Sequence, residues 1–207
     1  VKESRSEKFS KGDRVVVVPN IPGQILHPEI DQKPDIPVNY SKGNAFLGSG
    51  YDGMAQSCLV HPEECLVLIP DEIPNEIAVL AELSSVSHHA LSHVQEKLKK
   101  SDTRVALFGD GPVGYFTAVM LKYLYGVTAE RFVVFGAADD KLAHFDFARR
   151  ENVLSYDFKH SKEKFDVLIE CTGGKFSQSA LNQAIDIADS LADIIFMGVT
   201  EELVPID

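Results

Sequence analysis

The sequence has little of what marks secreted, membrane-spanning or low-complexity chains. It contains three cysteines among 207 residues, too few for a disulfide framework. Its N-terminus has no signal-peptide pattern, and its apolar runs are far shorter than a membrane span. Glycine, with 14 residues, and proline, with 10, are too scarce for a collagen-like or low-complexity chain. We therefore expect a globular, cytoplasmic protein.

A basic run is also missing. The formal net charge is −11, and both halves of the chain are acidic. Nucleic acid and anionic membranes are therefore not expected as partners. An anionic small molecule stays open as a ligand, because a local pocket can oppose the overall field. The hydrophobic share of 44% and the charged share of 25% are ordinary for a globular protein.

Residues 1–80 have the pattern of short strands joined by loops. Four consecutive valines at 15–18 predict a buried strand, and residues 54–60 and 65–69 predict two more. Residues 19–50 are rich in proline and glycine and predict a long irregular loop. We assign residues 1–80 to one β-rich domain.

Residues 81–207 change to an alternation of helix and strand. Helical periodicity appears at 77–84 and again at 90–100. Five strands are expected at 104–108, 132–135, 153–154, 167–170 and 194–197, with helices at 112–125, 140–148 and 178–188. This alternation predicts an α/β fold with a parallel sheet and right-handed crossovers, as in a Rossmann domain.

A glycine-rich turn follows the first of these strands. Gly109, Gly111 and Gly114 fit the pattern G-x-G-x-x-G, with Pro112 and Val113 at the start of the following helix. Gly109 would form the tight turn, Gly111 would let a pyrophosphate approach the backbone, and Gly114 would let helix and strand pack closely. The alternative is a glycine-rich turn without a ligand, but the strand–turn–helix context favours dinucleotide binding.

The end of the second strand bears on the choice of cofactor. NAD-binding proteins place an acidic residue there to bind the adenine ribose, whereas this sequence has Gly136. The lack of an acid removes a barrier to NADP, with Lys141 and the more distant Arg149 and Arg150 as candidate partners of a 2′-phosphate. Asp139 and Asp140 could instead reach the ribose of NAD, but their position also suits a helix start. We favour NADP over NAD.

A metal site is conceivable around Glu82, His88 and His89. Glu82 and His89 are two helical turns apart and could share a face, but two adjacent histidines cannot both reach one metal from a regular helix. On spacing alone, a solvated glutamate and partly buried histidines are the better interpretation.

Several segments resemble, in one order, the zinc-type medium-chain alcohol and polyol dehydrogenases. They are Lys11-Gly-Asp-Arg-Val-Val, Gly50-Tyr-Asp-Gly, Glu82-Leu-Ser-Ser-Val-Ser-His-His-Ala, Gly109–Gly114 and Glu170-Cys-Thr-Gly-Gly. Within that family, Ser49-Gly-Tyr-Asp-Gly-Met and Gly173-Gly-Lys-Phe-Ser-Gln-Ser-Ala look most like the ribulose-5-phosphate reductases. Such enzymes interconvert ribulose 5-phosphate and ribitol 5-phosphate and supply CDP-ribitol for teichoic-acid or capsule polymers.

The resemblance implies a GroES-like catalytic domain with zinc, a Rossmann domain with NADP, a sugar or polyol phosphate as substrate, and a homodimer. Glu82 matches a late zinc ligand, a match that reverses the interpretation from spacing. Val86 would pack against the nicotinamide, and Thr172, Gly198 and Val199 would form the cofactor wall. Lys42 in the long loop is a candidate to bind the substrate phosphate.

The chain also departs from that pattern. The family's Cys and His–Glu ligands precede the Lys11 segment and have no match in Cys58, Cys65, Cys171, His27 or His61. A sixth strand is expected of the sheet and is not found. We therefore expect the middle of a longer dehydrogenase, inactive by itself because a catalytic zinc needs three protein ligands. The alternatives are another zinc-dependent polyol or alcohol dehydrogenase, and a dinucleotide-binding fragment without catalysis.

Overall fold

The chain forms two compact units in the computed structural model, Val1–Glu82 and Leu83–Asp207. The structure describes residues 1–31, 33, 35–200 and 205. Within this part of the chain, no helix is both long enough and apolar enough to cross a membrane.

The first unit is β-rich, as predicted. Its strands are β1 (Val15–Val17), β2 (Asn20–Ile21), β3 (Ala45–Leu47), β4 (Gly50–Tyr51) and β5 (Leu66–Leu68). Strands β1 and β5 form an antiparallel pair, and β2, β3 and β4 form a second sheet. Its helical segments are α1 (Gly23–Leu26), α2 (Asn75–Ala78) and the 3-10 turns Val38–Tyr40 and Glu63–Cys65.

Three expectations for this unit are wrong. The strand expected to be buried at 15–18 is β1, whose three residues are only partly buried, and Val18 lies outside it and is exposed. Residues 19–50 are not only loop, since they contain β2, β3 and β4; residues 32 and 34 of that range lie outside the described residues. Residues 54–60 form no strand. The Gln56 N–H donates to the Met54 carbonyl at 2.8 Å, and the Gln56 side chain donates to the Gly53 carbonyl at 2.9 Å. These turn contacts satisfy backbone groups that a strand would pair with a neighbour.

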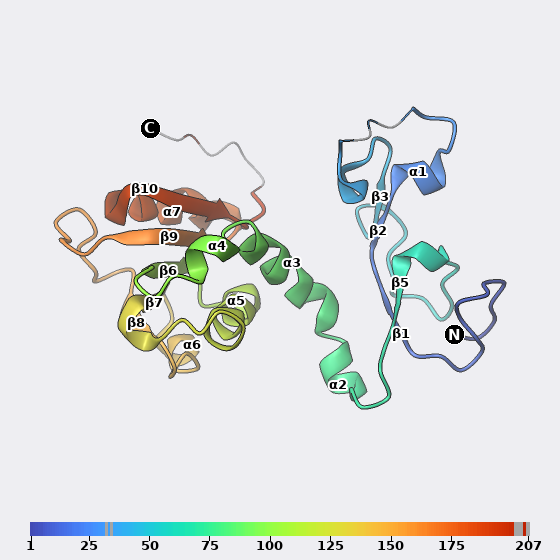
Figure 1. Cartoon of the computed structure of the whole chain (residues 1–207), viewed down its shortest axis with the longest axis horizontal. Coiled ribbons are helices and arrows are strands. Elements are labelled where there is room, and N and C mark those ends of the chain that lie inside the picture. The colour runs from blue at the N-terminus through green and yellow to red at the C-terminus, as the bar shows by residue number, and fades with distance from the viewer. Residues whose placement is uncertain (32, 34, 201–204, 206–207) are drawn as a thin grey trace. The chain divides into compact units, whose positions relative to one another are not determined.

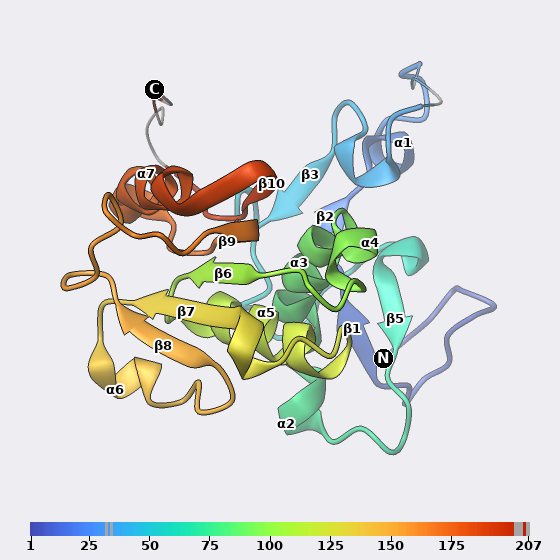
Figure 2. The ribbon, with the colours of Figure 1, turned by 60° about the vertical axis from the view of Figure 1, so that its left-hand side comes forward.

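The second unit contains a five-stranded sheet in the order β10-β9-β6-β7-β8, in which every neighbouring pair is parallel (Figure 2). The strands are β6 (Val105–Phe108), β7 (Phe132–Gly136), β8 (Arg149–Asn152), β9 (Phe165–Glu170) and β10 (Ala188–Phe196). The predicted fold class, a Rossmann-type parallel sheet with an additional β-rich part, is confirmed.

Helices cover both faces of this sheet (Figure 1). They are α3 (Ala81–Ser92), α4 (Gln95–Leu98), α5 (Pro112–Tyr123), α6 (Asp139–Leu142) and α7 (Ser177–Ile187). Alternate residues of the buried strands face opposite sides. Leu107 packs with Leu121 of α5, and Phe108 packs in the cluster that contains Ala184 of α7. A strand that is buried on both faces explains the continuous apolar sequence of β6.

Several boundaries in this unit differ from prediction. The helix expected at 140–148 ends at Leu142, and residues 153–154 form no strand, because β8 occupies Arg149–Asn152 just before them. The strand expected at 194–197 is β10, which already begins at Ala188 and ends at Phe196. Phe145 and Ala148 are buried, whereas Leu154 is 83% exposed. The chain turns back early because these two side chains enter the core, and pairing with β7 then fixes the register of β8.

Candidate dinucleotide site

The carboxyl ends of β6, β9 and β10 enclose a pocket of about 640 Å³. We call it the carboxyl-end pocket; its lining residues are Val86, Val113, Cys171, Thr172, Gly173, Gly174, Lys175, Phe176, Met197, Gly198 and Val199. Ligands of open parallel sheets bind outside the carboxyl ends of the strands. The pocket brings together five residues predicted to contact the cofactor: Val86, Val113, Thr172, Gly198 and Val199.

The glycine-rich turn lies directly beside this pocket. Gly109 has φ +129°, and a Cβ there would lie 3.0 Å from the backbone of Cys171. A Cβ at Gly114 would lie 2.1 Å from the Gly109 carbonyl oxygen, so helix α5 can approach the turn only without a side chain there. A Cβ at Gly111 would have no neighbour within 4 Å, and a phosphate could approach the backbone at this position.

Helix α5 begins at this turn, with Pro112 in its first turn and Gly111 as its N-cap. Among the described residues, no side chain caps the first turn of α5 by a hydrogen bond. The backbone N–H groups there are available to an anion, and the helix dipole favours negative charge. The turn and helix start therefore fit a pyrophosphate.

The turn after β7 binds a carboxylate from the glycine-rich turn, which the sequence argument missed. The Asp110 carboxylate accepts hydrogen bonds from the N–H groups of Ala137 and Ala138, each at 2.9 Å. A Cβ at Gly136 would lie 2.8 Å from this carboxylate. The lack of an acid at position 136 therefore does not leave this turn without one, because Asp110 supplies it from the glycine-rich turn.

The other candidates near this turn have different surroundings. Lys141 is exposed on α6, while the Asp139 carboxylate accepts a hydrogen bond from Asn152 at 2.8 Å. Arg149 donates to Glu163 at 2.9 Å, so its guanidinium is engaged at β8. Arg150 is exposed. Of the three predicted cations, Lys141 is the nearest in sequence to Gly136.

Glu170 is the buried acid that sequence reasoning missed. It ends β9, is 0% exposed, and accepts hydrogen bonds from Thr172, Gly173 and Gly198. The signal was present in the sequence: a single carboxylate after Val167-Leu-Ile, at the end of a buried strand, needs several hydrogen-bond donors.

Cys171 follows Glu170 and lines the carboxyl-end pocket. Its sulfur lies 3.6 Å from the Met197 sulfur and 3.9 Å from the Thr117 hydroxyl. Burial raises the pKa of the Cys171 thiol to about 12, and the charge of Glu170 adds to this, while the Thr117 hydrogen bond opposes it. The thiol is therefore protonated at neutral pH and serves as an apolar wall, not as a nucleophile.

The predicted zinc ligand Glu82 belongs to the first unit. Among residues 1–31, 33, 35–200 and 205, no group of three or more His, Cys, Asp or Glu side chains is placed to hold a metal. His89 instead pairs with His93, with 3.4 Å between their Nε2 atoms. The described residues do not by themselves provide a catalytic zinc site.

Comparison with curated proteins connects this geometry with a family. No family model matches the chain. It is 37% identical over 194 residues to ribulose-5-phosphate reductase 1 of Staphylococcus aureus, covering 93% of this chain and 53% of that protein. It is 32% identical over 201 residues to ribulose-5-phosphate reductase of Bacillus spizizenii, covering 96% and 55%. The chain spans about half the length of the curated relatives it matches.

Solved structures agree with this match. TarJ of S. aureus in complex with NADPH is 30% identical, with a TM-score of 0.68, covering 96% of this chain and 52% of that one. The alcohol dehydrogenase RspB of Escherichia coli CFT073, complexed with NADH, has a TM-score of 0.81 at 22% identity, covering 98% and 59%, and supports the fold. The resemblance to zinc-type alcohol and polyol dehydrogenases, and within them to ribulose-5-phosphate reductases, is confirmed.

Proposed function

We propose that this chain is the dinucleotide-binding part of an NADP-dependent reductase that interconverts ribulose 5-phosphate and ribitol 5-phosphate. The observation that carries the proposal is the carboxyl-end pocket beside the glycine-rich turn, where five predicted cofactor contacts line one space. The choice of substrate and of NADP rests on the similarity to the ribulose-5-phosphate reductases and to TarJ with NADPH.

The chain's own residues would bind and orient the cofactor. The backbone at Gly111 and the start of α5 would hold the pyrophosphate, and the turn at Gly136 would receive the adenine ribose. Val86, Val113 and Met197 give the pocket apolar walls that would exclude water from the nicotinamide. When bound, NADPH supplies the hydride that converts a ketose carbonyl to an alcohol.

The proposal also covers the anion-binding group, the metal, the compartment and the assembly of the parent enzyme. Lys175 lines the carboxyl-end pocket and offers a cation to an anionic substrate or cofactor. Zinc is proposed for the parent enzyme only, with Glu82 as one ligand, because the described residues offer no group of three. We place the parent in the cytoplasm as a homodimer; the three cysteines of this chain are unpaired, which agrees with a reducing compartment.

A second candidate is a dinucleotide-binding module without catalysis. The lack of a three-ligand metal group among the described residues favours it for this chain by itself. Both candidate functions predict that the chain binds the cofactor. Only the reductase predicts turnover of ribulose 5-phosphate, and it does so for the parent enzyme.

Paired fluorescence titrations with NADPH and NADH at one salt concentration test the proposal. We expect saturable binding with the lower Kd for NADPH. Tighter binding of NADH would contradict the NADP assignment, and no binding of either would contradict the site. An assay with ribulose 5-phosphate and NADPH then separates the candidates: we expect no turnover from this chain, and turnover would refute our expectation that it is inactive alone.

A further inference from the structure

Glu170 connects two separate turns that line the carboxyl-end pocket. Its Oε1 accepts hydrogen bonds from the Thr172 N–H at 2.8 Å, the Gly173 N–H at 3.1 Å and the Thr172 hydroxyl. Its Oε2 accepts a hydrogen bond from the Gly198 N–H at 3.0 Å. One carboxylate therefore joins the turn after β9 to the turn after β10.

We infer that Glu170 is a positioning residue for the dinucleotide: it holds the walls of the carboxyl-end pocket at the spacing that the cofactor requires. The inference rests on the proposed function. Glu170 is fully buried and is not among the residues that line the pocket, so it would act through Thr172, Gly173 and Gly198, which do line it.

A carboxylate suits this position better than any neutral side chain. Four donors converge on it, and an ionised carboxylate is an acceptor at both oxygens. An amide of the same size has one acceptor oxygen, and its NH2 group would face an N–H donor. A buried charge is tolerated only with such compensation, so the four donors also account for a buried acid at the end of β9.

The close packing at Gly198 supports a fixed spacing. A Cβ there would lie 2.5 Å from Glu170 Oε2 and 2.7 Å from the Gly173 nitrogen. The two turns also share a backbone hydrogen bond from Gly174 to the Val199 carbonyl at 2.8 Å. The turns therefore meet through the carboxylate with no room for a side chain between them.

The test compares Glu170→Gln with Glu163→Gln in the full chain. Glu163 is also a partly buried, hydrogen-bonded carboxylate, but it precedes β9 at the opposite, amino edge of the sheet. We expect Glu170→Gln to weaken NADPH binding about tenfold or more, because the link to Gly198 is lost. We expect Glu163→Gln to leave the Kd for NADPH unchanged, even if it lowers the thermal midpoint as much as Glu170→Gln does.

Hydrogen exchange gives a readout that does not depend on cofactor. In Glu170→Gln, we expect faster exchange in peptides covering residues 171–174 and 197–199, and unchanged exchange in β7. An unchanged NADPH Kd overturns the inference, as does a loss of affinity matched by Glu163→Gln. If the unmodified chain binds no NADPH, the proposed function fails for this chain. In that case the connection between the two turns is still tested, because unchanged hydrogen exchange at 197–199 in Glu170→Gln would show that Glu170 does not hold them together.

Gly198→Ala keeps the test decisive if Glu170→Gln does not fold. The added methyl group would clash with Glu170 Oε2 and with the Gly173 backbone, and would push the two turns apart while the carboxylate charge is kept. From Gly198→Ala alone we expect about the same loss of NADPH affinity, and an unchanged Kd would overturn the inference. Where Glu170→Gln folds, the double variant should lose much less affinity than the product of the two single effects. Independent, multiplicative effects would overturn the inference.

Discussion

The Asp110 carboxylate occupies the space where a side chain at Gly136 would have to lie. A Cβ at Gly136 would be 2.8 Å from Asp110 Oδ2, which accepts the N–H groups of Ala137 and Ala138. The glycine-rich turn and the end of β7 are thus connected through one acid. In the proposed complex, this acid lies beside the adenine ribose, where the extra phosphate of NADP would be.

Asp110→Asn is therefore expected to change the preference between cofactors. Its amide oxygen can still accept the N–H of Ala137 or Ala138, but the negative charge is gone. We expect NADPH binding to tighten up to about fivefold, because two like charges a few ångströms apart repel by about 1 kcal/mol in water. NADH binding should change little. Titrations of both cofactors check the ratio; a selective loss of NADH affinity would instead assign Asp110 to the ribose hydroxyls.

Gly111→Ala and Gly114→Ala separate binding from folding. At Gly111 a methyl group meets nothing within 4 Å, so we expect an unchanged thermal midpoint and at least about tenfold weaker NADPH binding, since the methyl would occupy the approach of the pyrophosphate. At Gly114 the methyl would lie 2.1 Å from the Gly109 oxygen, and we expect a loss of stability of about 1–3 kcal/mol or more.

Thermal unfolding and a fluorescence titration of both variants check this pair. Normal NADPH binding by Gly111→Ala would show that no pyrophosphate approaches the turn there. An unchanged midpoint for Gly114→Ala would show that α5 and the turn can separate without cost.

The sheet and the glycine-rich turn could be predicted because their signals are local. The apolar sequences of β6 and β7 and the spacing of Gly109, Gly111 and Gly114 each lie within a few residues. The start of β8 could not be predicted, because pairing with β7 decides it and the local sequence does not.

The two acids that organise the site were missed for the same reason. Asp110 contacts Ala137 and Ala138, and Glu170 contacts Gly198. Partners 27 or 28 residues apart give no periodic signal in a sequence. The sequence shows that position 136 has no side chain, and the structure supplies the reason, because the Asp110 carboxylate fills the space where one would lie.

The three cysteines should differ sharply in reactivity. Cys58 is exposed, Cys65 is buried, and Cys171 is partly buried at the wall of the carboxyl-end pocket. Burial raises the pKa of Cys65, as does the neighbouring Glu64, and it raises the pKa of Cys171 to about 12. Since thiolates are the reactive form and only about one Cys171 thiol in ten thousand would be ionised at any moment at pH 8, Cys171 should react slowly.

We therefore expect one fast thiol per folded chain in a titration with a disulfide reagent at pH 8. Cys58→Ser should remove the fast phase, and full reactivity of all three thiols should return in denaturant. A fast phase that persists in Cys58→Ser would contradict the raised pKa values of Cys65 and Cys171.

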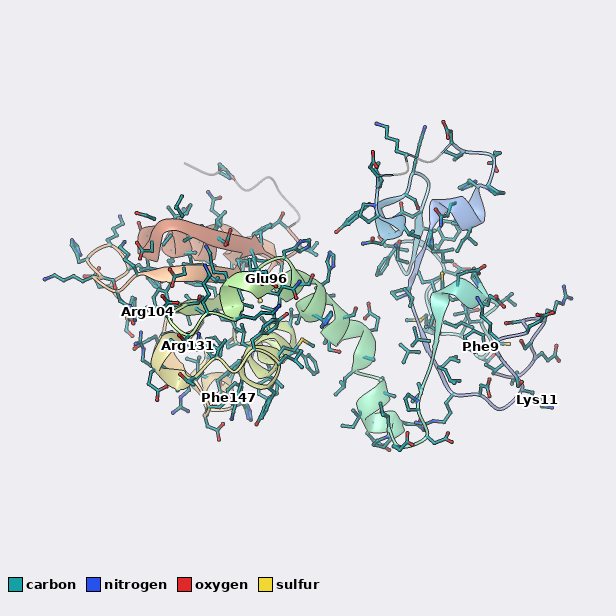
Figure 3. The ribbon with its side chains drawn as sticks, viewed as in Figure 1. Phe9, Lys11, Glu96, Arg104, Arg131 and Phe147 are labelled. Atoms are coloured by element: carbon teal, nitrogen blue, oxygen red, sulfur yellow. The ribbon has the colours of Figure 1, made fainter. Side chains whose placement is uncertain are left out.

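Glu163 should make the second unit sensitive to acid. Its carboxylate joins Arg104 at the amino end of β6 to Arg149 of β8, and Arg104 is labelled in Figure 3. Burial by itself would raise the pKa of Glu163, but the hydrogen bonds and charges of Arg149 and Arg104 outweigh it, and the pKa lies below its usual 4.5. Folding therefore favours the ionised form.

The sign of the pH dependence follows from the lowered pKa. The contribution of Glu163 to stability is fully present above its unfolded pKa and is lost as pH falls through the folded pKa. Relative to the unmodified chain, Glu163→Gln should lose about 1–3 kcal/mol at pH 7, because two guanidinium groups lose their partner. This difference should shrink as pH falls from about 5 to about 3.

Denaturant unfolding of both chains at pH 7, 5, 4 and 3 measures this difference. Glu96→Gln is the matched control, because Glu96, also labelled in Figure 3, pairs with Lys99 at 2.6 Å on the surface, with 79% of its side chain exposed. An exposed pair contributes at most about 1 kcal/mol, and we expect Glu96→Gln to stay within that limit at every pH. A pH-independent difference for Glu163→Gln would mean that packing around the side chain, and not its charge, stabilises the amino edge of the sheet.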